Sequence, residues 1–333
     1  MTGQTILIVD SNPDDLAFTA QVLGPEHRLA FAWSGRSVMA AVRKHKPALV
    51  LLDLDLPDMD GFAVAREIKA DPETSVIPVV FVAARNSVGD EAGAFREVHG
   101  CLFKPMVPAE LLACVRKQVA LHQHARTEAA YREALLMLGK ASHFRDDRAG
   151  RHPQRMAAYA AALAEAAGWD NAQIRLLELA AALHDIGELG VPDSIVLKPL
   201  KLDADEWETM KTHCRLGHDM LICHDAPVFK MAAAVALHHH EKWDGSGYPD
   251  RLSGTAIPEA ARIVAVADVF DALTMNRPYR QAWPVDAAIA TLNCAAGTHL
   301  EPRLVKLFEG ILPRILEIKA EKEAVARSED RAA

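Results

Sequence analysis

Histidine and aspartate residues with metal-binding chemistry are concentrated in the second half of the chain. Three consecutive histidines, His238 to His240, lead into a charged and aromatic segment that ends in Gly247-Tyr248-Pro249. His184 and Asp185 are adjacent and follow an apolar segment. Neutral imidazole is a common ligand of transition metals, and a carboxylate can bridge two cations while its neighbour binds one. Taken alone, the triple histidine fits equally well a helix that ends in exposed side chains before an ordinary turn.

Seven side chains are candidate metal ligands: His152, His184, Asp185, His213, His239, His240 and Asp268. One histidine in an apolar helix would more often be a hydrogen-bonded core residue. Five histidines and two aspartates on separate predicted segments favour a metal site, because burying so many unpaired polar groups would otherwise be costly. The mixture of imidazole and carboxylate suits Fe, Mn, Ni or Zn.

The elements that must position these ligands are helices. Apolar periodicity predicts helices over residues 157–166, 171–183, 205–223, 228–240, 260–273 and 285–295. Asp203 and Glu206 have the spacing of a capping box for the third of them. Because no convincing strand follows residue 143, we expect an all-α bundle, which can build a metal site from facing helices.

The first third of the chain has a different pattern. Apolar runs at 5–9, 48–52 and 78–82 alternate with predicted helices such as 34–45 and 62–70. This alternation predicts an α/β doubly wound parallel sheet of the flavodoxin-like kind. Asp10 and Asp53 follow two of the strands directly, at the edge where such sheets bind ligands. The alternative is that both merely cap the next helix.

Length and composition limit the remaining options. The chain has 333 residues, which predicts two domains, and a formal charge of −8, which disfavours a DNA-binding surface. The five cysteines form no CxxC pair and are expected to be reduced thiols. With neither a basic signal-peptide start nor an apolar run long enough to span a bilayer, we expect a cytoplasmic protein without membrane insertion.

Two segments of the first third resemble the receiver domains of response regulators. Residues 50–61 are similar to the phosphoacceptor segment, and Phe103-Lys104-Pro105 is similar to the Lys-Pro element. The resemblance covers residues 1–122. It implies that Asp53 accepts a phosphoryl group from a histidine kinase, that Lys104 contacts it, and that Asp10 helps to hold Mg²⁺.

Three positions depart from the receiver pattern. Ser11 replaces one member of an acidic pair, Ala83 replaces a Thr or Ser hydroxyl, and Cys101 replaces an aromatic switch residue. One carboxylate ligand for Mg²⁺ and one hydroxyl donor are therefore missing. We expect impaired or altered phosphorylation, and a domain that acts mainly in dimerisation or partner binding.

The second half resembles the HD-GYP branch of the HD-domain phosphohydrolases. The similarity rests on His184-Asp185-Ile186-Gly187, His239-His240-Glu241 and Gly247-Tyr248-Pro249, and extends to residues 210–213, 266–273 and 276–280. We assign this domain to residues 143–320, after a helical linker at 123–142 that could pair with its copy in a homodimer. A charged C-terminal tail at 321–333 follows.

This resemblance implies hydrolysis of cyclic di-GMP to pGpG, GMP or both. It implies two transition-metal ions, iron or manganese before nickel or zinc, held by the seven ligands with Asp185 as the bridge. A third cation is a further option. His238 falls outside the pattern.

The resemblance also assigns substrate contacts. Arg277 and Arg280 would grip phosphate, although solvated surface arginines are the plainer alternative. Gly247 and Tyr248 would shape the guanine side of the site. Metal-assisted attack of hydroxide on the phosphodiester is the mechanism that follows.

Glu188 is the most consequential departure. The family motif continues to a lysine that contacts the scissile phosphate, and this chain has an anion there. At ~4 Å and an effective dielectric constant of ~20, one like-charge contact costs roughly 4 kcal/mol before relaxation. Glu188 could instead turn toward a metal ion.

Three functions remain open from the sequence. The first is an active cyclic di-GMP phosphodiesterase regulated through its receiver. The second is a catalytically impaired protein that binds cyclic di-GMP or docks to a diguanylate cyclase. The third is an HD hydrolase acting on another phosphoester.

Overall fold

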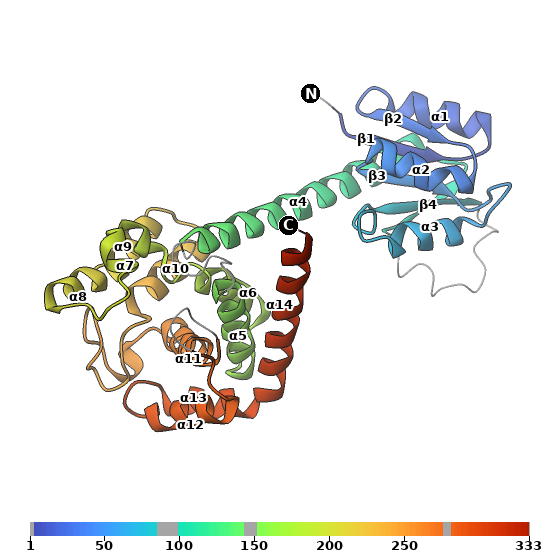
Figure 1. Ribbon diagram of the computed structural model, residues 1–333. Coiled ribbons are helices and arrows are strands. Elements are labelled where there is room, and N and C mark those ends of the chain that lie inside the picture. The colour runs from blue at the N-terminus through green and yellow to red at the C-terminus, as the bar shows by residue number, and fades with distance from the viewer. Residues whose placement is uncertain (1–2, 85–98, 143–151, 276–280, 333) are drawn as a thin grey trace. The chain divides into compact units, whose positions relative to one another are not determined.

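The computed structural model describes residues 3–84, 99–142, 152–275 and 281–332. The chain divides into two compact units, Met1–Ala130 and Tyr131–Ala333. Figure 1 shows an α/β unit at the N-terminal end of the chain and a helical unit at the C-terminal end. No helix of the described residues is both long and apolar enough to cross a membrane.

The first unit is built on a parallel five-stranded sheet with the order β2-β1-β3-β4-β5. Its strands are β1 (Thr5–Val9), β2 (Arg28–Ala32), β3 (Leu49–Asp53), β4 (Val79–Ala84) and β5 (Cys101–Lys104). This order is the flavodoxin-like one, so the predicted doubly wound sheet is confirmed. The switch point falls between β1 and β3, whose carboxyl ends carry the two predicted aspartates.

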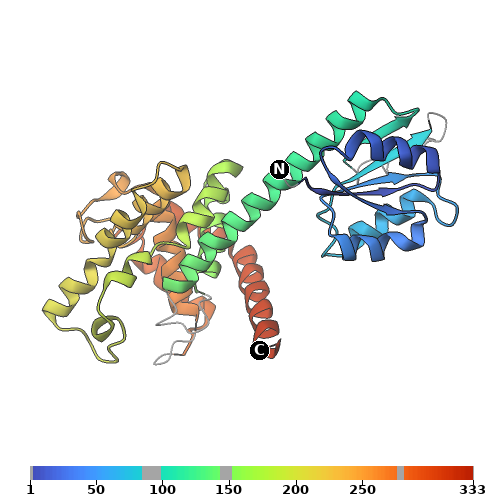
Figure 2. The same ribbon diagram turned by 90° about the horizontal axis from the view of Figure 1, so that it is seen from above.

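Helices cover both faces of this sheet, as Figure 2 shows for the first unit. Side chains of α2 (Gly35–His45) and α3 (Gly61–Ala70) form one apolar core with the strands. Those of α1 (Pro13–Leu23) and the start of α4 (Pro108–Ser142) form the other. Sequence reasoning missed β2, because an edge strand buries only alternate side chains and shows no continuous apolar run.

The helix α4 is continuous over 35 residues, whereas the sequence left one helix or two abutting ones open. Leu111 and Val115, near its start, are buried in the first unit. Leu135, near its end, is buried in the second. The unit boundary therefore falls inside a helix.

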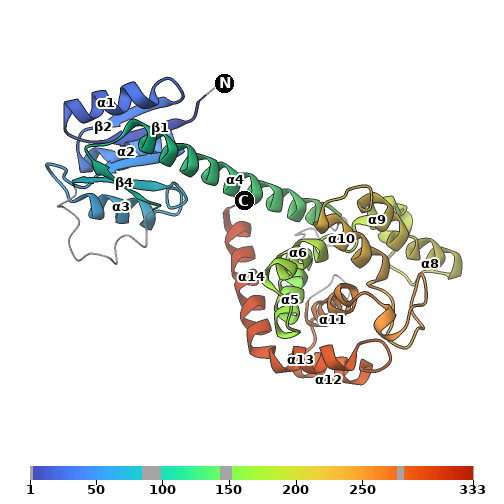
Figure 3. The ribbon, with the colours of Figure 1, turned by 180° about the vertical axis from the view of Figure 1, so that it is seen from behind.

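The second unit is helical, as predicted. Its main helices are α5 (His152–Ala166), α6 (Asn171–Ala181), α8 (Ala204–Lys211), α9 (His213–Leu221), α10 (Pro227–His238), α11 (Glu259–Thr274), α12 (Val285–Ala295), α13 (Pro302–Gly310) and α14 (Leu312–Ala332), with shorter turns η2 (Ile186–Gly190), α7 (Asp193–Val196) and η3 (Gly254–Ala256). Figure 3 shows α11 lying among α5, α10 and α13. Ile263, Val264 and Phe270 of α11 are fully buried, which makes this helix the centre of the core.

One predicted helix is wrong in its extent. Residues 205–223 form two helices, α8 and α9, which meet at Thr212. The predicted capping box of α8 is confirmed, since Asp203 and Glu206 each accept a hydrogen bond from the other's backbone N–H. The break matters because it makes His213 the first residue of a new helix.

Candidate metal centre

The seven predicted ligands lie in two groups of converging donor atoms. Asp185, His213, His239 and His240 form one group. His152, His184 and Asp268 form the other. Within each group the donor atoms lie within 4.8 Å of one another, close enough to surround one cation. Residues that are as far apart in the chain as 152 and 268 are thus brought together.

Asp185 lies between the two groups. Its Oδ2 is 3.0 Å from His184 Nε2, which belongs to the group of three. Its Oδ1 is 3.0 Å from His239 Nε2 and 3.5 Å from His213 Nε2 in the group of four. One carboxylate oxygen therefore faces each group, which is the arrangement that a bridging ligand requires.

The ligands are positioned at the ends of helices rather than along them. His152 begins α5, and His213 begins α9. His184 and Asp185 occupy the turn between α6 and η2, and the pair His239-His240 directly follows α10. Only Asp268 lies inside a helix, α11. Helix ends can converge on one point more closely than the sides of packed helices can.

Three of the histidines are oriented by backbone carbonyls. The Nδ1 of His184 is 3.0 Å from the Ala181 oxygen. The Nδ1 of His213 is 2.7 Å from the Met210 oxygen, and that of His239 has two carbonyl partners one turn back. A proton on Nδ1 that is donated to a carbonyl leaves Nε2 as the metal-binding nitrogen. In each case Nε2 is the atom that faces Asp185.

His152 is oriented by a carboxylate instead. Its Nδ1 is 2.7 Å from Asp271 Oδ2, while Arg155 donates two hydrogen bonds of 2.5 and 2.8 Å to the same carboxylate. Burial opposes ionisation of Asp271, yet the hydrogen bonds from His152 and Arg155 hold its pKa at about 2. The Nε2 atom of His152 lies 3.4 Å from Asp268 Oδ1.

Sequence reasoning did not assign Asp271 or Arg155 a role. A signal was present, because Arg155 follows His152 by three residues and Asp271 follows Asp268 by three. That spacing places each on the same helix face as its ligand.

Burial favours the neutral form of two ligand imidazoles, His213 and His240. It lowers the pKa of His213, and it lowers that of His240 well below the usual value, with the neighbouring His239 adding to the effect. Burial acts in the same direction on His239, but the hydrogen bond to Asp185 raises its pKa. Neutral imidazole is the form that binds metals, so the donor set fits two transition-metal ions.

Gly187 permits the close approach that brings Asp185 and His213 together. A Cβ atom at this position would lie 1.9 Å from the His213 carbonyl oxygen and 2.5 Å from the Gly217 nitrogen. No real Cβ tolerates either distance. The Asp185 turn can therefore pack directly on the first turn of α9 only if residue 187 is glycine.

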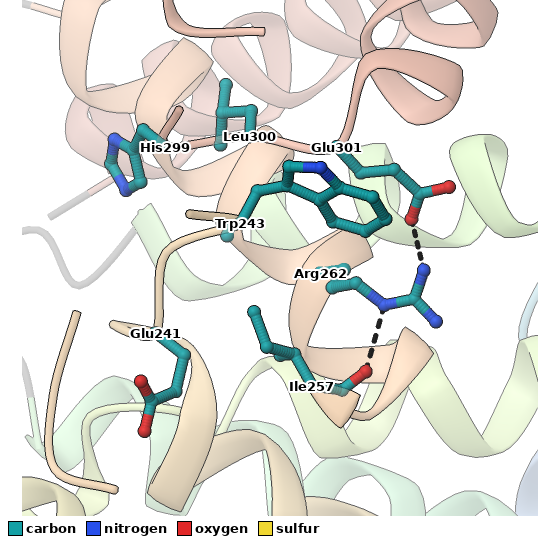
Figure 4. A pocket seen from close by; sticks show the side chains of 8 residues that line it. Glu241, Trp243, Ile257, Arg262, His299, Leu300 and Glu301 are labelled. Atoms are coloured by element: carbon teal, nitrogen blue, oxygen red, sulfur yellow. Dashed lines mark hydrogen bonds and ion pairs between the residues drawn. The ribbon is translucent and has the colours of Figure 1, made fainter. Parts of the chain in front are cut away.

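The loop that follows His240 is fixed at both ends. The buried Glu241 carboxylate accepts hydrogen bonds from the backbone N–H groups of Asp250 (2.7 Å) and Leu252 (3.1 Å). The backbone N–H of Trp243 donates to the His299 carbonyl, and the Arg262 guanidinium lies over the Trp243 ring. Figure 4 shows Arg262 in turn bonded to Ile257 and Glu301, at a small cavity separate from the metal ligands.

This loop places the predicted substrate residues Gly247 and Tyr248 beside the ligands. The Tyr248 ring stacks on His240, with ring centroids 4.9 Å apart and an angle of 30° between the planes. A Cβ on Gly247 would lie 2.3 Å from the Lys242 nitrogen, so a side chain there would displace the loop. One face of Tyr248 is thus already used to hold a ligand.

The remaining predicted residues divide between described and undescribed parts of the chain. Arg277 and Arg280 lie outside the described residues. Glu188 is half-buried in η2, where its backbone N–H donates to the Asp185 carbonyl at 2.9 Å. Within the part of the chain that the structure describes, Glu188 belongs to neither of the two ligand groups, and His238 lies in a third cluster of possible ligands with Glu241 and Asp250.

The receiver residues also meet. Lys104 Nζ lies 3.0 Å from Asp10 Oδ2 and 2.8 Å from Asp53 Oδ2, as the predicted set requires. It also lies 2.8 Å from Asp15 Oδ2 of α1, a residue that sequence reasoning missed. Although burial opposes it, the hydrogen bonds that Lys104 donates to the three carboxylates raise the pKa of its ammonium group. Asp15 lies four residues after Ser11, and its carboxylate supplies this edge with an acidic group that Ser11 lacks.

Comparison with known proteins agrees with both units. The response regulator receiver domain family matches residues 6–116, and the HD domain family matches residues 109–304. HD domains are metal-dependent.

Two relatives match over most of this chain and of their own length, and a third matches over part of each. The cyclic di-GMP phosphodiesterase response regulator RpfG of Xanthomonas campestris is 40% identical over 91% of this chain and 86% of its own length. A cyclic di-GMP phosphodiesterase of Thermotoga maritima is 30% identical over 94% of this chain and 92% of its own. A 3'3'-cGAMP-specific phosphodiesterase of Vibrio cholerae is 42% identical over 53% of this chain and 34% of its own. The chain therefore belongs to the family of response regulators in which a receiver domain precedes an HD domain of the cyclic di-GMP phosphodiesterase type.

Proposed function

We propose that this protein hydrolyses cyclic di-GMP to pGpG, GMP or both in a metal-dependent reaction. The observation that carries the proposal is the position of Asp185, whose two oxygens face two separate sets of histidines at 3.0 Å. A protein that only bound a partner would have no physical use for so many converging ligands. The relatives named for this activity span the whole architecture.

The chain's own residues hold and orient the reacting groups. Bound iron or manganese ions would supply Lewis acidity and lower the pKa of a water molecule. Asp185 would fix the spacing of the two ions, while the carbonyl-anchored histidines keep Nε2 directed at them. Arg277 and Arg280 would neutralise the phosphate, and Gly247 with Tyr248 would border the guanine. A third ion is not needed for this arrangement.

Signalling would reach the enzyme through the receiver. A histidine kinase is the expected phosphoryl donor, with Asp53 as acceptor. The missing hydroxyl at Ala83 supports a weak phosphorylation response. Asp15, by contrast, gives this edge a third carboxylate beside Asp10 and Asp53 that could help to hold Mg²⁺. A homodimer formed along α4 and contact with a diguanylate cyclase are further parts of this proposal.

A second candidate function rests on Glu188. An anion one turn after the bridging aspartate would oppose both the dianionic ligand and a hydroxide nucleophile. Under that reading the helical unit binds cyclic di-GMP, or docks to a cyclase, without hydrolysing it. A related cyclic dinucleotide such as 3'3'-cGAMP, the named substrate of one relative, is the alternative ligand.

One experiment separates these functions. Purified protein loaded with Mn²⁺ or Fe²⁺ is incubated with cyclic di-GMP or 3'3'-cGAMP, and the products are resolved by chromatography. Appearance of pGpG or GMP from cyclic di-GMP is expected. Measurable binding without turnover under any of the candidate metals would instead assign the protein to the sensor class.

A further inference from the structure

The helix α8 presents an exposed tryptophan next to the metal centre. Trp207 is 46% exposed, and its ring meets Tyr248 edge-on, with centroids 6.0 Å apart and an angle of 79°. Lys211 follows one turn later on the same helix face, with its Nζ 5.8 Å from the Tyr248 ring centroid. Figures 1 and 3 show α8 at the edge of the helical unit beside α9.

These side chains continue outward from a metal ligand. Tyr248 stacks on His240 and meets Trp207, so a row of three rings leads from the ligand group to the surface. The same helix ends two residues before His213, another ligand. Trp207 is therefore connected through one side chain, that of Tyr248, to the candidate metal ligand His240.

Core packing does not account for Trp207. The helix α8 has no buried residue, and Trp207 belongs to none of the apolar clusters formed by the described residues. The helix is held instead by its capping box and by the ion pair of Lys198 with Glu206. Tryptophan is enriched at binding surfaces, and Trp207 differs from a lone surface side chain because its ring contacts Tyr248 beside the ligand His240.

We propose that Trp207 and Lys211 form a base-binding subsite in which a guanine of the cyclic dinucleotide stacks on the exposed indole. Stacking on an aromatic side chain suits any base, because every base has a π face. The ammonium of Lys211, which pairs with the exposed Glu208 at 2.6 Å and would turn from it to the base, adds selectivity, since guanine offers the O6 acceptor where adenine offers an amino donor. This inference rests on the proposed function and names a substrate contact for it.

The test compares Trp207→Ala with Trp207→Phe in the full-length, metal-loaded protein. We expect Trp207→Ala to raise KM for cyclic di-GMP about 5- to 150-fold with little change in kcat, the range typical of one lost stacking contact. Trp207→Phe should recover most of the loss. Lys211→Met should reduce the preference for cyclic di-GMP over cyclic di-AMP.

Two controls isolate the base contact. Turnover of bis(p-nitrophenyl) phosphate, a phosphodiester without a nucleobase, should change less than about twofold in Trp207→Ala. Trp33→Ala removes a 63% exposed tryptophan from the first unit and should leave every constant unchanged. An equal loss on both substrates in Trp207→Ala would overturn the subsite, because it would indicate a displaced ligand His240.

Failure of the proposed function has a different signature. If the wild-type protein cleaves no cyclic dinucleotide, the same variants are compared by the Kd for cyclic di-GMP in calorimetry. A 5- to 150-fold weaker Kd in Trp207→Ala, recovered in Trp207→Phe, would support the subsite without the activity. An unchanged Kd, or no binding by the wild type, would overturn it.

Discussion

Asp185 carries more of the candidate centre than any other side chain of the described residues, because it contacts histidines of both ligand groups. Its loss cannot be compensated by a neighbour. The other ligands each serve one group, and most are independently anchored through Nδ1.

We predict that Asp185→Asn binds fewer than two metal ions per chain. It should also lower kcat by more than the roughly 10- to 100-fold that follows loss of a residue that only orients a metal ligand. The amide keeps the shape but removes the charge that holds the second ion. Metal content by mass spectrometry and turnover of cyclic di-GMP are the measurements.

His238→Gln is the matched control, since His238 is adjacent in sequence to two ligands but lies with Glu241 and Asp250 in a third cluster, outside both ligand groups. It should retain both ions. Loss of a metal ion in this variant would show that His238 is itself a metal ligand.

Glu188→Lys should raise kcat about 10-fold or more, because it replaces an anion with a cation near the phosphate site and each 1.4 kcal/mol of relieved repulsion is worth about tenfold. The kcat of Glu188→Gln, which only removes the charge, should lie between those of the wild type and Glu188→Lys. Steady-state rates at saturating metal give the order. A lower rate for both variants would instead assign Glu188 a metal-ligand role.

In the receiver, Ala83→Thr should increase labelling of Asp53 by acetyl phosphate several-fold. Ala83 is fully buried in β4, where a threonine hydroxyl would supply the missing donor to the phosphoryl group. Ala83→Val has the same shape without the hydroxyl and should stay at the wild-type level. Strong labelling of the unmodified protein would refute the proposed impairment.

Residue types predicted the candidate ligands but not the groups that orient them. Imidazole pairs and adjacent His-Asp are visible in a sequence because their chemistry is rare in apolar segments. Asp271, Arg155 and Asp15 are ordinary charged residues in helices, where solvated surface is the usual explanation. Their roles depend on distances that only the fold sets.

At the scale of elements, η2 packs so closely on α9 that residue 187 has no room for a Cβ atom. Gly187→Ala should lower the free energy of unfolding by about 1–3 kcal/mol or more, because the added methyl meets the His213 carbonyl and must push the two segments apart. Metal affinity should fall with it.

Gly310→Ala provides the comparison for this substitution. Nothing lies within 4 Å of a Cβ built at Gly310, so its free energy of unfolding should stay within about 0.5 kcal/mol of the wild type. Chemical denaturation of the two variants, followed by circular dichroism, tests the difference. Equal stabilities would mean that η2 moves without cost.

The helices between residues 152 and 295 and the central strands were predictable because their apolar periodicity is strong, and the capping box marked the start of α8. The helices α13 and α14 were not among those predicted, and α14 includes residues 321–332 of the predicted charged tail. The break between α8 and α9 was not predictable. Both segments continue one apolar pattern, and Thr212 keeps helical dihedral angles at the junction. The edge strand β2 was missed because only two of its five residues are fully buried, so it shows no continuous apolar run.

At the scale of the whole molecule, the two units have separate apolar cores. Ligands of the candidate centre lie only in the second. We predict that removing metal with EDTA lowers the protection of backbone amides against hydrogen exchange in the helical unit and leaves that of the receiver unchanged, because a ligand stabilises only the structure that binds it. Hydrogen exchange resolved by peptide measures each unit.

Adding back Mn²⁺ should restore the lost protection in the helical unit, which excludes damage by the chelator. A shift of equal size in the peptides of β1, β3 and β4 would contradict the prediction. It would show that the two units unfold together despite their separate cores.

The shared carboxylate of Asp185 has a thermodynamic consequence for the two ions. Sites that use a common ligand cannot fill independently, so occupancy of one changes the affinity of the other, and reciprocity requires the same factor in both directions. A calorimetric titration with Mn²⁺ should therefore depart from the curve of two identical independent sites. The departure gives the coupling free energy, and its sign tells whether the half-filled centre is the stable species or a transient one.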